Sequence, residues 1–461
     1  MDFLIKKDSF GEIKIPKNVY WGTSTQRSLN YFNIGSEKIP YEIINAYGYI
    51  KKAAAIVNRE YKILKPKKAQ AIIEACDELL DGKLDSNFPL SVWQTGSGTQ
   101  THMNINEVIA NRATEIIGRN TIIDPHDDVN ISQSSNDTFP TALHIAIILS
   151  IQNNLLPAIK NLENTLHKKS NEFQNIVKIG RTHLQDAVPL TLGQEFSGWV
   201  EMLKKSYNMI TNSLEFTREL AIGGTAVGTG MNSYENFGES VTTIISELTK
   251  QRFICAPNKF HALTSHDTLV TTHGALKALA CDMMKIANDI RWLASGPKCG
   301  LGEIQIPLNE AGSSIMPGKV NPTQSEAVTM VAVQVMGNDT TIGFAASQGN
   351  FELNVFQPVI AYNFLQSIRL LTDSLLSFDK NCAKGITPNI ANLDKNLQNS
   401  LMIATALNPY IGYDNVSKVV QEAYKNNTSI KEELINMNML TEKEFNTYID
   451  IKKMIQPKEK I

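Results

Sequence analysis

Three stretches of the chain are dense in serine, threonine, asparagine and glycine, which are residues that could bind an anion. They are Gln94–Gln100, Ser132–Asp137 and Gly312–Pro322. Each offers short hydroxyl or amide donors, and two contain glycines that let the backbone approach a ligand. Lys319 adds a full positive charge, and hydrogen bonds to charged acceptors are the stronger kind. Polar loops are also ordinary surface connections, so one stretch alone is open to either interpretation.

Two of the polar segments, Ser134–Asn136 and Gly180–Ala187, stand where helices are expected to begin. A helix N-terminus presents free N–H groups and a positive dipole to an anion, although a serine there is also an ordinary cap. His183 could be a general acid or base, or a structural histidine, because its free pKa lies near neutrality. The stretch Gly223–Gly230 lacks the order of a phosphate-binding loop and follows no evident strand, so it predicts a break between helices.

Long helices must position these loops. One apolar row recurs every seven residues and a companion row follows three positions on: Leu269, Leu276, Met283 and Ile290, then Leu279, Ile286 and Leu293. This seam predicts a helix over 265–295, ended by Gly296-Pro297, that packs beside similar helices. Segments near 138–170, 187–220 and 323–373 are similarly long. We therefore predict a mainly α fold with a central bundle of long helices.

The length of 461 residues predicts more than one structural unit. Pro-containing polar breaks interrupt the chain before residue 134, and the Gly385–Asn389 loop marks a second change. We expect an N-terminal domain over 1–134, the central helical bundle over 135–391 and a small C-terminal helical domain over 392–461.

Composition excludes several classes of protein. Formal net charge is −2, from 44 basic and 46 acidic residues, which argues against a nucleic-acid partner. The five cysteines are odd in number and scattered, so we expect no disulfide framework, structural zinc or iron–sulfur cluster. The first residues lack the apolar run of a signal peptide, and we expect no stretch with the ~20 apolar residues that cross a bilayer. These features predict a cytoplasmic protein without a membrane partner.

The segment Gly312–Pro322, reading GSSIMPGKVNP, resembles the signature loop of the fumarase/aspartase superfamily. Further blocks follow in that superfamily's order: Trp93–Gln100, Asn104–Asn111, Asp128–Pro140, Gly180–Glu195 and Gly349–Asn354. The resemblance covers essentially the whole chain. It implies a three-domain, largely helical subunit, a homotetramer whose active sites are each built from three subunits, and no metal or organic cofactor.

Local details favour the class II fumarate hydratases within this superfamily. Gly318 and His183 stand where aspartases usually carry alanine and glutamine, and Glu352 is also similar to fumarases. The implied activity is that of a hydro-lyase of the tricarboxylic acid cycle, the reversible trans hydration of fumarate to (S)-malate through an aci-carboxylate intermediate. Aspartate ammonia-lyase is the nearest alternative, and an enzymatically silent structural relative is another. A nucleotide-binding oxidoreductase has no supporting strand–glycine–helix unit.

The resemblance assigns roles to particular residues. Ser313 would take the C3 proton, while His183 would handle the departing hydroxyl with Glu326 as its acidic partner. Lys319 would stabilise the charge that develops on the substrate. The residues that would hold the carboxylates are Ser97, Thr99, Ser134, Ser135, Asn136, Thr182, Lys319 and Asn321.

Two departures from the fumarase pattern stand out. Fumarases commonly carry a second anion pocket with the pattern His-Pro-Asn-Asp, where this chain has Asp124, Pro125, His126 and Asp127. A dicarboxylate could still bind there, but an anionic residue has replaced a potential cation. His102 stands where asparagine is usual, beside the Gln94–Gln100 loop. It has either a direct role or is a tolerated substitution.

Overall fold

A computed structural model describes residues 2–457 of the chain. The chain folds into two compact units. Unit 1 comprises Met1–Pro157, Ser206–Ala280 and Val331–Thr372, and unit 2 comprises Ala158–Lys205, Cys281–Met330 and Asp373–Ile461. The division into three domains, with boundaries after residues 134 and 391, stays a prediction.

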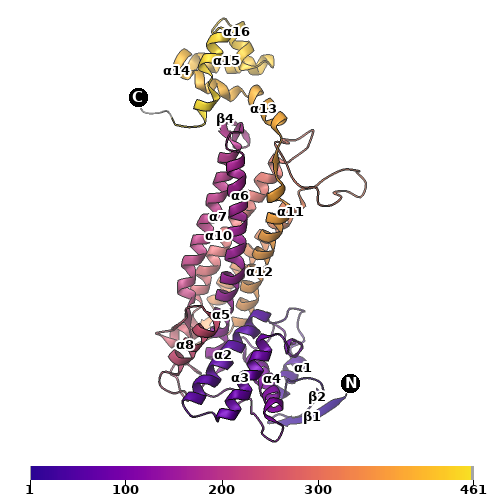
Figure 1. Cartoon of the computed structure of the whole chain (residues 1–461), viewed down its shortest axis with the longest axis vertical. Helices are drawn as coiled ribbons and strands as arrows, with labels where there is room; N and C mark the ends of the chain where they lie inside the picture. Colours follow the sequence, from indigo (N-terminus) through magenta and orange to yellow (C-terminus); the bar gives the residue numbers. More distant parts are fainter. Residues whose placement is uncertain (1, 458–461) are drawn as a thin grey trace. The chain divides into compact units, whose positions relative to one another are not determined.

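Long helices lying side by side form the bundle that the sequence predicts (Figure 1). They are α5 (Ser135–Ser150), which continues through a π turn at Ile151–Leu155 into α6 (Leu156–Glu172), α7 (Leu192–Thr217), α10 (Asp267–Leu293), α11 (Thr323–Ala346) and α12 (Gln357–Asn381). All seven residues of the predicted apolar seam in α10 are buried. The helix predicted over 265–295 is therefore confirmed, and so is the mainly α fold.

Two of the expected helical segments contain hairpins instead. The segment expected to be helical from 187 begins as part of a hairpin of β3 (Val177–Thr182) and β4 (Gln185–Thr191). The segment expected over 323–373 breaks after α11, where β8 (Gly349–Asn350) pairs with β9 (Leu353–Asn354). The first hairpin turns through two non-glycine residues with positive φ, His183 and Leu184, and the second has one, Phe351, so the sequence carries no ordinary turn signal at either.

The remaining elements of unit 1 include helix α2, which is buried along most of its length. They are β1 (Phe3–Asp8), β2 (Gly11–Pro16), α1 (Thr23–Tyr31), α2 (Tyr41–Glu60), α3 (Pro66–Leu80), α4 (Thr99–Ile117), β5 (Glu219–Leu220), α8 (Phe237–Thr249), β6 (Ile254–Cys255) and α9 (Lys259–Thr264). Helix α2 packs against α3, α5 and α8. It carries two polar side chains, Lys51 and Asn58, into the interior together with its apolar residues.

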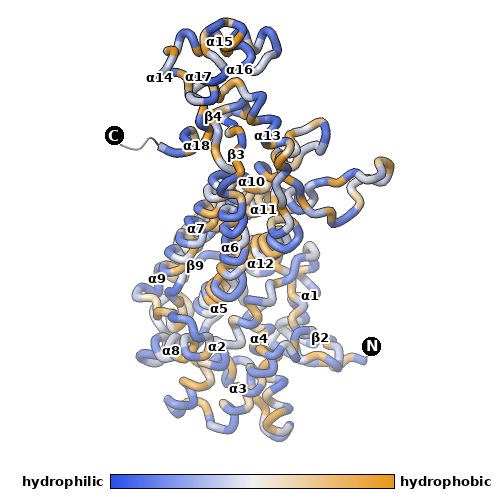
Figure 2. The backbone as a smooth tube through the Cα atoms, turned by 45° about the horizontal axis from the view of Figure 1, so that its top comes forward, coloured by the Kyte–Doolittle hydropathy of each residue, from blue (hydrophilic) through white to orange (hydrophobic). Residues whose placement is uncertain are grey.

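The remaining elements of unit 2 are short helices and one small sheet. They are β7 (Ile304–Gln305), β10 (Thr387–Pro388), α13 (Ile390–Asn399), α14 (Asn408–Ile411), α15 (Tyr413–Asn426), α16 (Ile430–Asn436), α17 (Glu442–Tyr448) and α18 (Ile451–Met454). The helices from α14 to α17 have a core of their own around Leu407, Val419 and Leu434. Hydrophobic and hydrophilic residues are interleaved along the helices, as amphipathic packing requires (Figure 2).

The continuous helix Ser135–Glu172 is long and apolar enough to cross a membrane by length and composition. The expectation that no stretch is so apolar was therefore wrong. In the structure, 72% of the apolar window is buried inside the protein. The apolar character of this helix is thus explained by its place in the core of the bundle.

Candidate active site

Three hydroxyl groups from two of the predicted loops meet in unit 1. The Ser97 hydroxyl lies 2.8 Å from that of Thr99, which in turn lies 2.8 Å from the hydroxyl of Ser135. Thr99 begins α4 and Ser135 begins α5, so the N-termini of two helices converge here. The two predicted binding loops are therefore one group of donors, close enough to share an anion.

The N-terminus of α5 is fixed by a buried carboxylate that sequence reasoning missed. Asp137 is fully buried and accepts hydrogen bonds from the backbone N–H groups of Ser134, Gly223 and Thr225 at 2.9–3.0 Å. Burial raises the pKa of Asp137 to about 6, although these three bonds oppose the rise. Asn136 donates to the Ala226 carbonyl at 2.7 Å. The stretch Gly223–Gly230 thus forms the turn that packs on this loop, and Ser134 with Asp137 makes a capping box that its sequence does signal.

Glycine is required at two positions of the Gln94–Gln100 loop. A side chain at Gly96 would run into the backbone of Val355, whose neighbour Gln357 donates to the Gly96 carbonyl at 3.0 Å. Gly98 has φ of +72° and lies against the Phe139 ring. The residues that pack on this loop, Val355 and Gln357, directly follow the Gly349–Asn354 block.

In unit 2, His183 lies at the tip of the β3–β4 hairpin. His183 and Leu184 are the two turn residues, with φ of +58° and +60°. Such a turn prefers Asn-Gly, and a leucine there is strained. The imidazole and the neighbouring Thr182 are exposed, so the hairpin presents both side chains outward. Strain of this kind persists where surrounding contacts hold the backbone, and it is common at functional sites.

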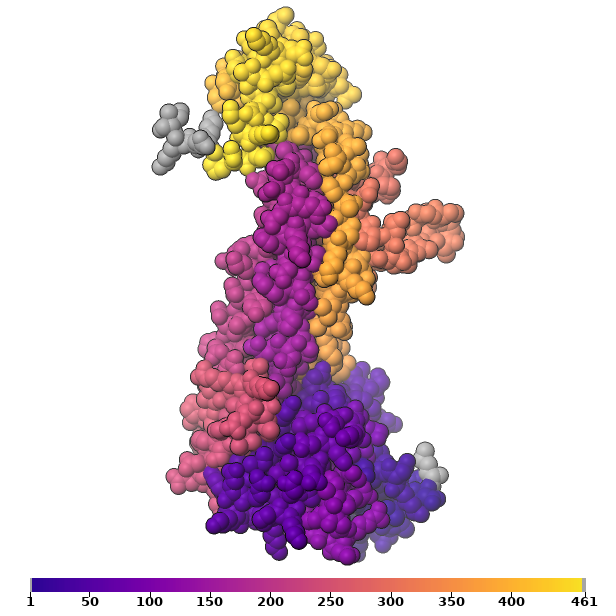
Figure 3. Space-filling view, in the orientation of Figure 1, coloured from indigo at the N-terminus to yellow at the C-terminus, as the bar shows by residue number. Residues whose placement is uncertain are grey.

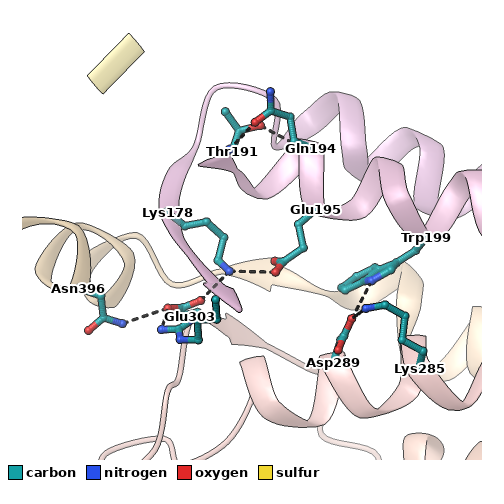
Figure 4. A network of polar contacts seen from close by, with 10 residues as sticks. Lys178, Thr191, Gln194, Glu195, Trp199, Lys285, Asp289, Glu303 and Asn396 are labelled. Carbon is teal, nitrogen blue, oxygen red and sulfur yellow. Dashed lines mark hydrogen bonds and ion pairs between the residues drawn. The ribbon is translucent and has the colours of Figure 1, made fainter. Parts of the chain in front are cut away.

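A buried ion network holds the base of this hairpin (Figure 4). Lys178 lies 3.1 Å from Glu195 and 3.2 Å from Glu303, while Arg181 lies 2.6 Å from Glu303. Asn396 also donates to Glu303 at 3.1 Å. Burial alone would raise the pKa of Glu303, but the hydrogen bond from Arg181 and the charge of Lys178 hold it below its ordinary value. Glu303 therefore stays ionised and fixes β3 beside β7.

The signature loop folds back on itself. Gly312 donates its N–H to the Lys319 carbonyl at 2.9 Å, and the Asn321 amide donates to the Gly312 carbonyl at 2.5 Å. The Ser313 hydroxyl oxygen accepts two backbone N–H groups, from Ile315 at 3.2 Å and from Met316 at 2.9 Å. The segment around residues 300–320 projects from the surface of unit 2 (Figure 3). Lys319 and Ile315 are both exposed on it.

Comparisons with known proteins agree in both sequence and structure. A family model described as Lyase matches residues 11–337, and one described as Fumarase C C-terminus matches residues 403–456. A class II fumarate hydratase of Bacillus anthracis is 60% identical over 462 residues, covering 100% of both chains. The chain belongs to the class II fumarate hydratase family. A Helicobacter pylori member is also 60% identical, over 99% of this chain and 100% of that one.

A solved structure of this fumarate hydratase class has the same fold. Recombinant class II fumarase from Schistosoma mansoni superposes with a TM-score of 0.95 at 41% identity, covering 98% of this chain and 99% of that one. The expected fumarase/aspartase fold is therefore confirmed. Membership of the class II fumarate hydratases also confirms the expectation of a hydro-lyase over an aspartate ammonia-lyase.

The predicted fumarate hydratase residues fall into two groups. Unit 1 brings together Ser97, Thr99, Ser134, Ser135 and Asn136, while unit 2 carries Thr182, His183, Ser313, Lys319, Asn321 and Glu326. Glu326 lies in the first turn of α11. Within one chain, no hydrogen bond or ion pair joins Glu326 to His183 among residues 2–457. The roles assigned to these residues stay predictions.

The segment Asp124–Asp127, where a second anion pocket was expected, is closed by its own side chain. The Asp124 carboxylate accepts the backbone N–H groups of His126 at 2.7 Å and Asp127 at 2.9 Å. Asp128 accepts the Asp124 N–H and forms an ion pair with Lys68. The carboxylate thus takes donors that an anion would otherwise use. Binding of a dicarboxylate there stays an untested prediction.

Proposed function

We propose that the chain catalyses the reversible hydration of fumarate to (S)-malate, with Ser313 as the base that removes the C3 proton of malate. The observation that carries this proposal is the pair of hydrogen bonds that Ser313 Oγ accepts from the backbone N–H groups of Ile315 and Met316. A serine hydroxyl is a poor base unless its oxyanion is stabilised, and two such donors lower the cost of forming it. The family membership supplies the substrate class.

The reaction can be written with these residues. In the dehydration direction, the Ser313 oxyanion takes the C3 proton of malate, and the C–H electrons move into the neighbouring carboxylate to give the aci-carboxylate. Lys319 and Asn321 stabilise the charge that develops there. The C2–O bond then breaks, and His183 protonates the leaving hydroxyl so that it departs as water. The hydroxyl and amide groups of Thr99, Ser134, Ser135 and Asn136 hold the carboxylates, with Ser97 and Thr182 beside them.

We also propose that the chain forms a homotetramer whose active sites draw on three subunits. Helix α11 exposes large apolar side chains at Met330 (67%), Val333 (61%) and Phe344 (71%). A helix that is apolar on more than one face is normally buried on more than one face. The signature loop projects from its own unit (Figure 3), and Glu326 has no hydrogen bond or ion pair with a histidine among residues 2–457. In the proposed tetramer, a neighbouring subunit would contact the signature loop and supply a histidine for Glu326. We further propose a cytoplasmic location.

The decisive experiment is an assay of purified protein by the ultraviolet absorbance of fumarate. Malate should give fumarate and aspartate should not. Ser313→Ala should lower kcat by about 10²–10⁴-fold, the usual contribution of a positioned acid or base, with KM changed far less. Ser314→Ala is the matched control, because that neighbouring hydroxyl has no assigned role, and it should keep near-normal turnover. A Ser313→Ala protein with normal kcat would remove Ser313 as the base.

A further inference from the structure

A lysine is buried beneath the donor loop of unit 1, and no carboxylate of the described residues 2–457 forms an ion pair with it. Lys51 of α2 is 1% exposed, and its ammonium donates to Gln133 Oε1 at 2.9 Å and to Asn130 Oδ1 at 3.3 Å. Burial lowers its pKa to about 7, against the opposing charge of Asp137. Taking an ammonium out of water without an ion-pair partner costs several kcal/mol. Both acceptors of its ammonium belong to one short segment, so the buried lysine stabilises the conformation of that segment.

That segment, Val129–Gln133, has an irregular backbone held by side chains. The Gln133 side chain donates to the carbonyls of Val129 at 3.2 Å and Ile131 at 3.0 Å, and Asn58 of α2 donates to Ile131 at 3.3 Å. Ser132 has φ of +64°, a conformation that costs a non-glycine residue about 1–3 kcal/mol. Because Ser134 follows directly, the position of its hydroxyl depends on this held backbone.

His102 of α4 holds the same segment from the other side. It is 2% exposed; its Nδ1 lies 2.7 Å from Thr138 Oγ1 and its Nε2 lies 2.7 Å from Asn130 Oδ1. Asn130 Oδ1 can only accept, so Nε2 donates to it, while the Thr138 hydroxyl that contacts Nδ1 also donates to the Ser134 carbonyl at 2.7 Å. Burial and the charge of Lys51 hold the pKa of His102 well below its usual value, which agrees with a neutral ring. Both ring nitrogens thus have partners inside unit 1, which favours a positioning role for His102 over direct contact with the substrate.

We infer that Lys51 and His102 are positioning residues that meet at Asn130 and fix the Ser134–Asn136 donors for a substrate carboxylate. Lys51 holds the segment Val129–Gln133 from α2, and His102 ties it through Thr138 to the first turn of α5. Neither residue touches the substrate. The inference rests on the proposed function for the identity of the bound anion, but the restraint on the loop stands on the geometry alone.

The first test compares Lys51→Met with Lys52→Met. Met fills the space of the buried lysine but cannot donate, so the loop donors should lose their fixed position. We expect KM for malate to rise about 10-fold with kcat within about 3-fold, because carboxylate donors act on ground state and transition state alike. Lys52 pairs with Asp77 of α3, away from the loop, so its variant should keep both constants.

Hydrogen exchange gives a readout that does not depend on catalysis. Amides of residues 129–137 should exchange about 10-fold or more faster in Lys51→Met than in Lys52→Met. Unchanged exchange, or faster exchange with an unchanged KM, would overturn the inference. An inactive wild-type protein would instead refute the proposed function, and exchange would still report on the loop.

The second test uses His102, in case the lysine variant does not fold. His102→Ala removes both bonds and should raise KM and the exchange rate as Lys51→Met does. His102→Asn keeps one amide contact and should restore most of the wild-type KM. In a Ser134→Ala background, Lys51→Met or His102→Ala should raise KM by less than about 3-fold, because coupled residues are not additive. Additive effects, or no rescue by asparagine, would show a general structural role and contradict the inference.

Discussion

At the scale of single residues, a buried histidine limits the stability of this protein at low pH. His266 is almost fully buried, and neither of its ring nitrogens makes a hydrogen bond within the described residues. Burial lowers its pKa to about 3. The folded state therefore holds the neutral imidazole. In the unfolded chain, the pKa of His266 returns to the ordinary value of about 6.5.

This difference predicts a specific acid sensitivity. The unfolded state binds a proton at His266 below about pH 6.5, while the folded state does so only near pH 3, so stability is lost as pH falls through that window. His266→Gln should reduce the fall in thermal midpoint between pH 6.5 and pH 4. His167→Gln, at an exposed position, should leave the wild-type slope unchanged. Equal slopes in wild type and His266→Gln would contradict this assignment.

At the scale of elements, the β3–β4 hairpin presents His183 from a turn whose backbone is strained. Leu184 is 66% exposed with φ of +60°, so its own burial does not explain the leucine. A left-handed conformation costs a non-glycine residue about 1–2 kcal/mol. The ion network around Glu303 is what holds the strands while the tip stays strained (Figure 4).

Substitutions at Leu184 should therefore follow the turn preference rather than hydrophobicity. Leu184→Gly should keep or raise the thermal midpoint, and Leu184→Val should lower the free energy of unfolding by about 1 kcal/mol because β-branched residues fit positive φ poorly. Thermal or denaturant melts of the two variants measure this order. A valine variant as stable as the glycine variant would show that the tip is unstrained.

The elements also show what the sequence could predict. The seam in α10 was readable because its seven apolar residues repeat at helical spacing and are all buried. The hairpins were not, because the strands of β8–β9 are two residues long and both hairpins turn through residues other than Asn-Gly. The signature loop was found by its resemblance, since no periodicity marks it. The contact between His102 and Asn130 joins residues 28 apart, a pairing that local spacing cannot reveal.

At the scale of the whole molecule, the exposed apolar residues of α11 argue for assembly. Val333 and Met330 lie one turn apart on the helix, and both are more than half exposed in the single chain. Such patches on soluble proteins mark interaction surfaces. In a closed symmetric oligomer one substitution is repeated at every copy of the interface, so its effect multiplies.

A charge on this face should therefore dissociate the proposed homotetramer. Val333→Glu would bury an unpaired carboxylate at each contact, at a cost of several kcal/mol. We expect it to elute as a smaller species in size-exclusion chromatography and to lose activity in proportion. Tyr424→Glu, at an exposed position of α15, should keep the wild-type elution volume. An unshifted Val333→Glu protein would place the interface elsewhere.

The projecting signature loop also bears on inheritance. If Ser313 completes a site whose serine and threonine donors come from another chain, two inactive alleles need not give an inactive cell. Co-expression of Ser313→Ala with Ser134→Ala would yield mixed oligomers in which some sites receive neither altered residue. Activity recovered on co-expression, and absent when separately purified homo-oligomers are merely combined, would be intragenic complementation. Its complete absence would place both residues of each site on one polypeptide.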